Sequence, residues 1–230
     1  MPTLYHHPMS AASRFVRLVL SEYDLEADLV EERPWEQRPD FLALNPAATL
    51  PVYVDDSLQA VCGATVISEF IDEVFGVFKR DRRLLPDEPF RRAEVRRLTE
   101  WFLVKMEQDV TRYLVRERVF KLLMPKENGG GAPDSKALRA ARANIHQHMR
   151  YLDWLTASRD WLAGNTMSYA DFAAAGALSA LDYLGEIKWG ETANAKEWYQ
   201  RMKSRPCMRP LLADRVSRIA PVSQYADLDF

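Results

Sequence analysis

The sequence has little that could stabilise the chain through covalent cross-links. It contains only two cysteines, Cys62 and Cys207, far apart in the sequence and in neither a metal-binding nor a redox spacing. Their scarcity excludes the disulfide framework of small secreted proteins, and we expect a cytoplasmic location. No run approaches about 18 uninterrupted apolar residues, so we expect no membrane insertion. The first residues also lack the basic and apolar regions of a secretory signal.

Strong charge and metal-binding patterns are also missing. The formal net charge of −2 gives no bulk attraction to nucleic acid or to anionic lipid. His146 and His148 are two positions apart on a predicted helix, about 200° around its axis, so they cannot share one metal. The glycines at 129–131 lack the Lys-Ser/Thr that follows in a phosphate-binding loop. We therefore expect no metal, no nucleic-acid partner and no nucleotide loop.

What is present is the composition of an ordinary globular protein, with 47% apolar and 28% charged residues in 230 positions. Short strand-like runs alternate with helices in the first part. Strands are predicted at 3–6, 28–31, 51–55 and 59–61, and helices at 10–23 and 64–75. The order is βαβ, then a hairpin, then a helix. It predicts a small mixed sheet with helices packed on it.

The remainder of the chain is predicted to be helical. A charged, proline-containing linker at 79–89 separates a first domain (1–78) from a second (90–230). Helices are predicted at 90–124, 135–156, 168–184, 195–203 and 210–219, with a flexible hairpin at 127–133. Ser168 and Asp171 form the pattern of a capping box, which we interpret as a helix-stabilising feature.

Four segments, in order, resemble the glutathione transferase family over nearly the whole chain. Residues 4–18 are similar to its first strand, active-site loop and first helix, and residues 45–52 to its Asn-Pro-x-Gly-Lys-Val-Pro-Val segment. Residues 164–171 and 204–206 resemble two motifs of its helical half. The resemblance implies an α/β thioredoxin-like domain followed by an all-α bundle, with Pro51 as the family's cis-proline.

The same resemblance implies a vestigial glutathione site at Ser10, Leu50, Pro51, Gly63 and Ala64. Ser10 stands where the family stabilises the glutathione thiolate, with Ser13 as the neighbouring alternative, although a serine there often only caps the helix. Gly63 and Ala64 replace a Glu/Gln-Ser pair that binds the γ-glutamyl end. Losing two charge-assisted hydrogen bonds would cost roughly 3–6 kcal/mol, or about two to four decades in affinity. We expect glutathione binding to be weak or absent, no cofactor, and no catalytic residue unless Ser10 serves as one.

Three residues are candidates for a partner-binding surface. Trp35 lies in a polar loop, where a large indole either packs or binds something. Arg116 and Glu117 lie in a charged stretch beside the glycine-rich hairpin. Such a stretch could meet an acidic partner, although solvation is the more ordinary explanation.

The last residues are unusual because acidic and apolar side chains alternate. Asp227, Leu228 and Phe230 belong to this tail. Terminal residues are usually frayed. Leu228 and Phe230 would instead suit docking on the protein's own surface or in the groove of a partner.

Among family members with a degraded glutathione site, the chain most resembles those that bind FtsZ, the bacterial cell-division tubulin homologue. Overall length, the Gly63-Ala64 replacement and the tail suggest this similarity. It implies a non-catalytic, cytoplasmic homodimer at the division site that binds FtsZ filaments through two sites. The alternative is an active glutathione transferase that uses Ser10.

Overall fold

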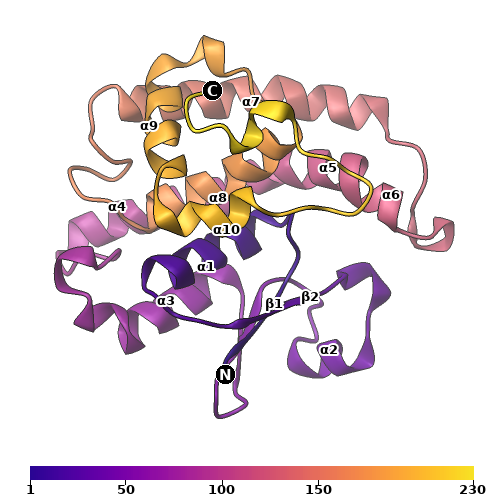
Figure 1. Ribbon diagram of the computed structural model, residues 1–230, viewed down its shortest axis with the longest axis horizontal. Coiled ribbons are helices and arrows are strands. Elements are labelled where there is room, and N and C mark those ends of the chain that lie inside the picture. The colour runs from indigo at the N-terminus through magenta and orange to yellow at the C-terminus, as the bar shows by residue number, and fades with distance from the viewer.

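The computed structural model describes all 230 residues and has two parts (Figure 1). The first part holds four strands and three helices. The strands are β1 (Thr3–His6), β2 (Asp28–Glu31), β3 (Val52–Val54) and β4 (Ala60–Cys62), and the helices are α1 (Ala11–Glu22), α2 (Pro39–Leu44) and α3 (Ala64–Val74). All strands and helices that we expected in this part are present, with boundaries within about two residues of the predicted ones.

One mixed sheet with the strand order β2-β1-β3-β4 organises this part. β1 pairs in parallel with β2 and antiparallel with β3, which continues into the hairpin with β4. All three residues of β3 are buried, because α1 and α3 contact the sheet on one side and Phe41 of α2 on the other. α2 was not predicted. Its proline in the first turn and its one fully buried side chain give it too little periodicity to detect.

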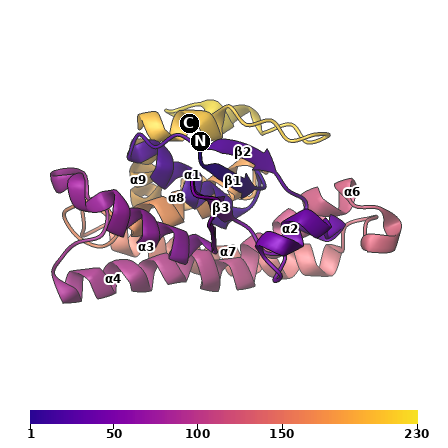
Figure 2. The same ribbon diagram turned by 90° about the horizontal axis from the view of Figure 1, so that it is seen from below.

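The second part is entirely helical. Its helices are α4 (Pro89–Glu100), α5 (Arg112–Val115), α6 (Lys121–Leu123), α7 (Ser135–Thr156), α8 (Tyr169–Tyr183), α9 (Ala193–Lys203) and α10 (Arg209–Leu212). α4, α5 and α6 belong to one long helix, because π-helical turns at Trp101–Lys105, Glu107–Thr111 and Arg116–Phe120 connect them. Figure 2 shows this helix extending along most of the length of the molecule. The extent of this helix agrees with the helix predicted over residues 90–124. Its π-helical turns were not predicted, because they left no recognisable pattern in the sequence.

α8 lies at the centre, and every one of its residues is buried. It packs directly on α1, and Gly176 makes the close approach possible, since a Cβ there would lie 2.9 Å from the backbone nitrogen of Phe15. One continuous apolar core therefore includes residues of both parts. This packing of α8 on α1 fixes the two halves against each other.

The predicted capping box at the start of α8 is confirmed. The Asp171 carboxylate accepts hydrogen bonds from the Ser168 amide at 2.9 Å and from the Ser168 hydroxyl at 3.2 Å. It also accepts from the Leu162 amide and the Trp198 indole, both at 3.0 Å. Burial nevertheless raises the pKa of Asp171 to about 6, because desolvation outweighs these donors.

The prediction of a helix over residues 210–219 is wrong. α10 ends at Leu212, and an isolated bridge then pairs Val216 with Ile219. The Tyr183 hydroxyl satisfies this turn by accepting from the Val216 amide at 3.1 Å and donating to the Ile219 carbonyl at 2.7 Å. A contact from α8 thus replaces the helical hydrogen bonds that the local pattern favoured. No helix in the structure combines the length and the apolar character needed to cross a bilayer.

Candidate functional site

The loop between β1 and α1 presents Ser10 at the start of a 12-residue helix. The Ser10 Oγ accepts a hydrogen bond from the Ser13 amide at 3.2 Å, so the helix-capping interpretation is confirmed. Its own hydroxyl hydrogen is not used in a protein contact and remains available as a donor. Ser13 is fully buried and accepts from the His7 amide at 3.3 Å. Of the two serines, only Ser10 is partly exposed.

The loop before β3 has the conformation that the resemblance implied. The Leu50–Pro51 peptide bond is cis, which confirms that expectation for Pro51. Asn45 supports the turn, since its side-chain amide donates to the Thr49 carbonyl at 2.8 Å. Leu50 is half-buried.

The start of α3 has no side chain that could bind a charged amino-acid group. Gly63 occupies the N-cap with φ of 92° and makes no side-chain cap, and Ala64 follows as the first helical residue. No atom lies within 4 Å of the position that a Cβ on Gly63 would take. Thr65, the next polar residue, lines a separate pocket between α3 and α4. None of the main pockets is lined by Ser10, Leu50, Pro51, Gly63 or Ala64.

An aromatic cluster connects the two parts at the loop that leads to Ser10. The His7 ring meets Phe120 edge-on with centroids 4.8 Å apart, and the Trp35 ring lies 5.0 Å from Phe120. His7 is buried, and desolvation lowers its pKa to about 3, so its ring is neutral. Trp35 is half-buried and therefore packs within the protein while keeping an exposed part.

Trp35 and Arg116 are distant in sequence but converge on one turn, Lys126–Gly129. The Asn128 side-chain amide donates to the Trp35 carbonyl at 3.4 Å. The Arg116 guanidinium lies against Gly129, 3.3 Å from where a Cβ would be. Arg116 is exposed and has no acidic partner. The structure thus brings Trp35, through its carbonyl, and the free cationic side chain of Arg116 to one turn, and we name this region the Trp35–Arg116 surface.

Glu117 lies outside this surface. Its side chain is buried, and its carboxylate accepts from the Asp134 amide at 2.6 Å and pairs with Lys121 at 2.5 Å. It therefore anchors the start of α7 to the long helix. In this conformation Glu117 offers nothing to a partner.

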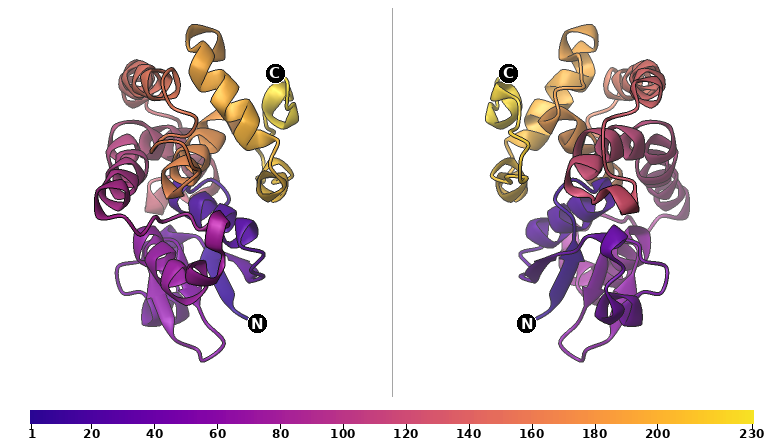
Figure 3. Two further views of the ribbon diagram at one scale, coloured as in Figure 1. Left: turned by 90° about the vertical axis from the view of Figure 1, so that its left-hand side faces the viewer. Right: turned by 90° about the vertical axis from the view of Figure 1, so that its right-hand side faces the viewer.

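The C-terminal tail is docked on the protein's own surface, beside α9 (Figure 3). The Phe230 ring packs against Trp189 with centroids 5.3 Å apart, and the Lys203 ammonium lies 4.0 Å from the centre of that ring. Lys203 is buried and also donates to the Asp227 carbonyl. Leu228 is 42% exposed. Phe230 therefore docks on the protein's own surface and not in the groove of a partner, while Leu228 remains accessible.

Sequence reasoning missed the buried Arg14, which connects the tail to the first loop. Its guanidinium donates to the Pro8 carbonyl and, at 2.9 Å each, to the hydroxyls of Ser179 and Tyr225. Tyr225 is completely buried. The only available signal was an arginine within the apolar residues of α1. The C-terminal tail lies apart from the Trp35–Arg116 surface. The C-terminus is beside α9, far from α2 and α6 (Figure 1).

The side chains of His, Cys, Asp and Glu nowhere gather in a group of three that could hold a metal ion. His146 pairs with Glu191, and His148 pairs with Asp109, so the two histidines have separate acidic partners.

Comparison with protein families identifies the class. The chain matches the model of the glutathione S-transferase N-terminal domain over residues 4–80 and that of the C-terminal domain over residues 112–206. It belongs to the glutathione S-transferase family. Together with the sheet and the helical bundle, these matches establish the predicted fold of a thioredoxin-like domain followed by a helical domain.

Within that family, the chain is similar to FtsZ-localized protein A of Caulobacter vibrioides, with 43% identity over 99% of this chain and 98% of the relative. It is also similar to the glutathione S-transferase GstB of Escherichia coli, at 26% identity over 94% of this chain and 100% of that one.

Solved structures show the same relationships. A crystal structure described as a glutathione S-transferase from Sinorhizobium meliloti 1021 is 70% identical with a TM-score of 0.99, covering 100% of both chains. FzlA from C. crescentus is 43% identical with a TM-score of 0.91, covering 100% of this chain and 99% of that chain.

Proposed function

We propose that this protein is a non-catalytic glutathione-transferase-fold protein that binds FtsZ at the bacterial division site. The observation that carries the proposal is the 43% identity to FtsZ-localized protein A over nearly the full length of both chains. The relative at 26% identity that is named as a transferase is much more distant. The 70% identical crystal structure is described by the name of the family. That description agrees with the proposal, because the proposal assigns a function to this chain and keeps the glutathione-transferase fold.

The chemistry of the family cleft supports the non-catalytic part of the proposal. Glutathione would require an anionic and a hydroxyl group at the start of α3, and Gly63 and Ala64 supply neither. Backbone groups beside Leu50 and Pro51 remain, but backbone contacts alone forgo roughly 3–6 kcal/mol of charge-assisted hydrogen bonding. Titration calorimetry with millimolar glutathione is expected to show no saturable heat.

The Trp35–Arg116 surface is the FtsZ-binding surface that the geometry favours. A partly exposed indole held by Phe120 and a cation without an acidic partner are the side-chain types that dominate binding energy at protein interfaces. Leu228 and Asp227 form a second exposed candidate on the tail. Glu117 and Phe230 would act indirectly, by holding α7 and the tail in place.

A homodimer completes the proposal. Val66 of α3 is 56% exposed and Val104 of the long helix is 40% exposed. Between α3 and α4 lies a pocket of about 310 Å³ that Val104 and Thr65 line. Exposed apolar side chains beside such a hollow suit a self-complementary interface. Analytical ultracentrifugation is expected to give a dimer that Val66→Glu converts to a monomer, and a wild-type monomer at tens of micromolar would contradict this.

Co-sedimentation with polymerised FtsZ tests the central claim. Wild-type protein is expected in the pellet. Trp35→Ala with Arg116→Glu should remain in the supernatant, because the change removes the indole and reverses the free charge. Arg91→Glu, an exposed cation outside this surface, is the matched control. Wild-type protein that stays in the supernatant would refute the partner assignment.

An active glutathione transferase is the second candidate, and one observation favours it. The Ser10 hydroxyl keeps a free donor at the start of α1, where the helix dipole also stabilises a thiolate. A thiol-conjugation assay separates the two candidates. Turnover by the wild type that Ser10→Ala abolishes would establish the enzyme.

A further inference from the structure

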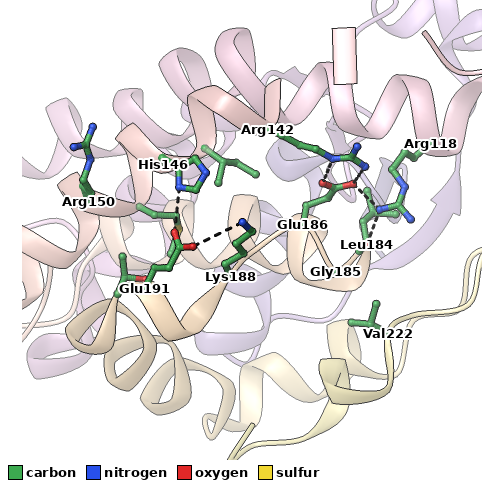
Figure 4. A pocket seen from close by; sticks show the side chains of 13 residues that line it. Arg118, Arg142, His146, Arg150, Leu184, Gly185, Glu186, Lys188, Glu191 and Val222 are labelled. Atoms are coloured by element: carbon green, nitrogen blue, oxygen red, sulfur yellow. Dashed lines mark hydrogen bonds and ion pairs between the residues drawn. The ribbon is translucent and has the colours of Figure 1, made fainter. Parts of the chain in front are cut away.

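A large pocket lies on the helical domain, away from the family cleft. It has a volume of about 950 Å³ and lies between α7, the connection from α8 to α9, and Val222 of the tail. Figure 4 shows basic side chains on both walls: some point toward Glu186 and others toward Glu191, whereas Arg150 at the left-hand end points away from both. The row of basic side chains consists of Arg118, Arg142, His146, Arg150 and Lys188.

One end of the pocket holds two arginines in fixed positions. The Glu186 carboxylate, only 4% exposed, binds the Arg142 guanidinium through two contacts of 2.7 and 2.8 Å. The same carboxylate binds Arg118 at 2.6 Å. One negative charge thus orients two positive ones, and the group keeps a net positive charge. Arginines held in this way lose little further side-chain freedom when they bind a carboxylate.

The other end carries additional positive charge. Glu191 lies 3.2 Å from His146 and 3.8 Å from Lys188. Arg150 is exposed and has no acidic partner (Figure 4). Four permanent cations and two carboxylates therefore line this pocket. The excess positive charge attracts an acidic ligand.

The shape of the pocket selects an extended ligand. Arg142, His146 and Arg150 occur every fourth residue along α7, so the row spans about 12 Å. Ile145 and Met149 form an apolar floor beside it. A compact anion reaches one end only, whereas about four residues of extended peptide cover the whole row. Because side chains alternate along an extended chain, one face can meet the floor while the other meets the cations.

We propose that this pocket binds an acidic segment of a partner protein in extended form, with acidic and apolar residues in alternation. The site is independent of the FtsZ proposal, because none of its residues belongs to the Trp35–Arg116 surface. The chain's own tail has the same alternation, but its Phe230 is already held by Trp189 and Lys203.

Fluorescence anisotropy with a labelled peptide of four Asp-Leu repeats tests the proposal. Saturable binding is expected within roughly 100 µM, and it should weaken with added salt. The double variant Arg150→Glu with Lys188→Glu should bind at least tenfold more weakly, because it replaces two cations of the pocket with anions. Both side chains are exposed, so the change should leave the fold intact. Arg91→Glu with Lys136→Glu changes the net charge equally at exposed positions outside the pocket and should bind like the wild type.

Three results would overturn the proposal. The first is that the wild type, shown to be folded by its thermal melt, does not bind the peptide. The second is that both double variants lose affinity equally, because the attraction would then be unspecific. The third is that a peptide of four Asp-Ser repeats binds as tightly, because the apolar floor would then play no part.

Discussion

Restoring the missing groups at the start of α3 should restore glutathione binding. The change is Gly63→Glu together with Ala64→Ser, which places a carboxylate and a hydroxyl where the family has its Glu/Gln-Ser pair. The backbone there is open, since no atom lies within 4 Å of the position of the new Cβ on residue 63. The φ of 92° at this residue is unfavourable for a side chain, and we expect a loss of about 1–3 kcal/mol in folding stability.

The gain in affinity follows from two hydrogen bonds. Each charge-assisted bond contributes about 1.5–3 kcal/mol, so the pair should strengthen binding by roughly two to four decades. If the Kd of the wild type is about 1–10 mM, the Kd of the double variant should then lie between about 0.1 and 100 µM. Ala64→Ser alone adds one of the two bonds and should gain about one to two decades.

Calorimetry on the wild type and both variants is the assay, with a urea denaturation curve to show that each is folded. Two results would refute the reasoning. Micromolar binding by the wild type would show that backbone contacts suffice. A folded double variant that still binds nothing would show that another feature, such as the cluster around His7, excludes the ligand.

Three further predictions concern stability in urea. Gly176→Ala should lower the free energy of unfolding by at least about 1–3 kcal/mol, because the new methyl group would collide with the backbone of α1. Gly190→Ala, which has open space around it, should lower it by less than about 1 kcal/mol. Equal losses in the two variants would contradict this. Burial raises the pKa of Glu107 from 4.5 to about 7, so the folded state holds this proton more tightly and wild-type stability falls as pH rises between those values. Glu107→Gln should therefore be more stable than wild type by up to about 3 kcal/mol at about pH 8 and equal near about pH 4, and a difference that does not vary with pH would be inconsistent. Tyr225→Phe removes a partner of the buried Arg14 and should cost about 1–3 kcal/mol; an unchanged midpoint would show that the tail is not anchored there.

Local pattern and family resemblance together were sufficient to predict most of the fold. The strands of the sheet, the capping box at Ser168 and Asp171, and the cis bond before Pro51 all depend on neighbouring residues or a family motif. The turn after α10 was mispredicted because its hydrogen bonds come from Tyr183, more than thirty residues away. Periodicity within a segment contains no information about such distant partners.

The candidate surfaces were less predictable for the same reason. Trp35 and Arg116 stood out individually in the sequence, but only the fold brings both to the turn at Lys126–Gly129. Glu117 looked like an exposed charge in the sequence. Its carboxylate is instead buried, where it accepts a hydrogen bond from the Asp134 amide and pairs with Lys121. The basic pocket combines side chains from α7 with others near residue 186, and no local pattern could have connected them.

The buried position of α8 determines how this protein can be studied in pieces. Because α8 lies against α1 with only a hydrogen atom at Gly176 between the backbones, a fragment ending before residue 79 would leave the apolar side of α1 in water. Truncations that separate the halves should therefore aggregate rather than report which half binds what. The surfaces that bind partners should therefore be mapped by point substitutions in the intact chain.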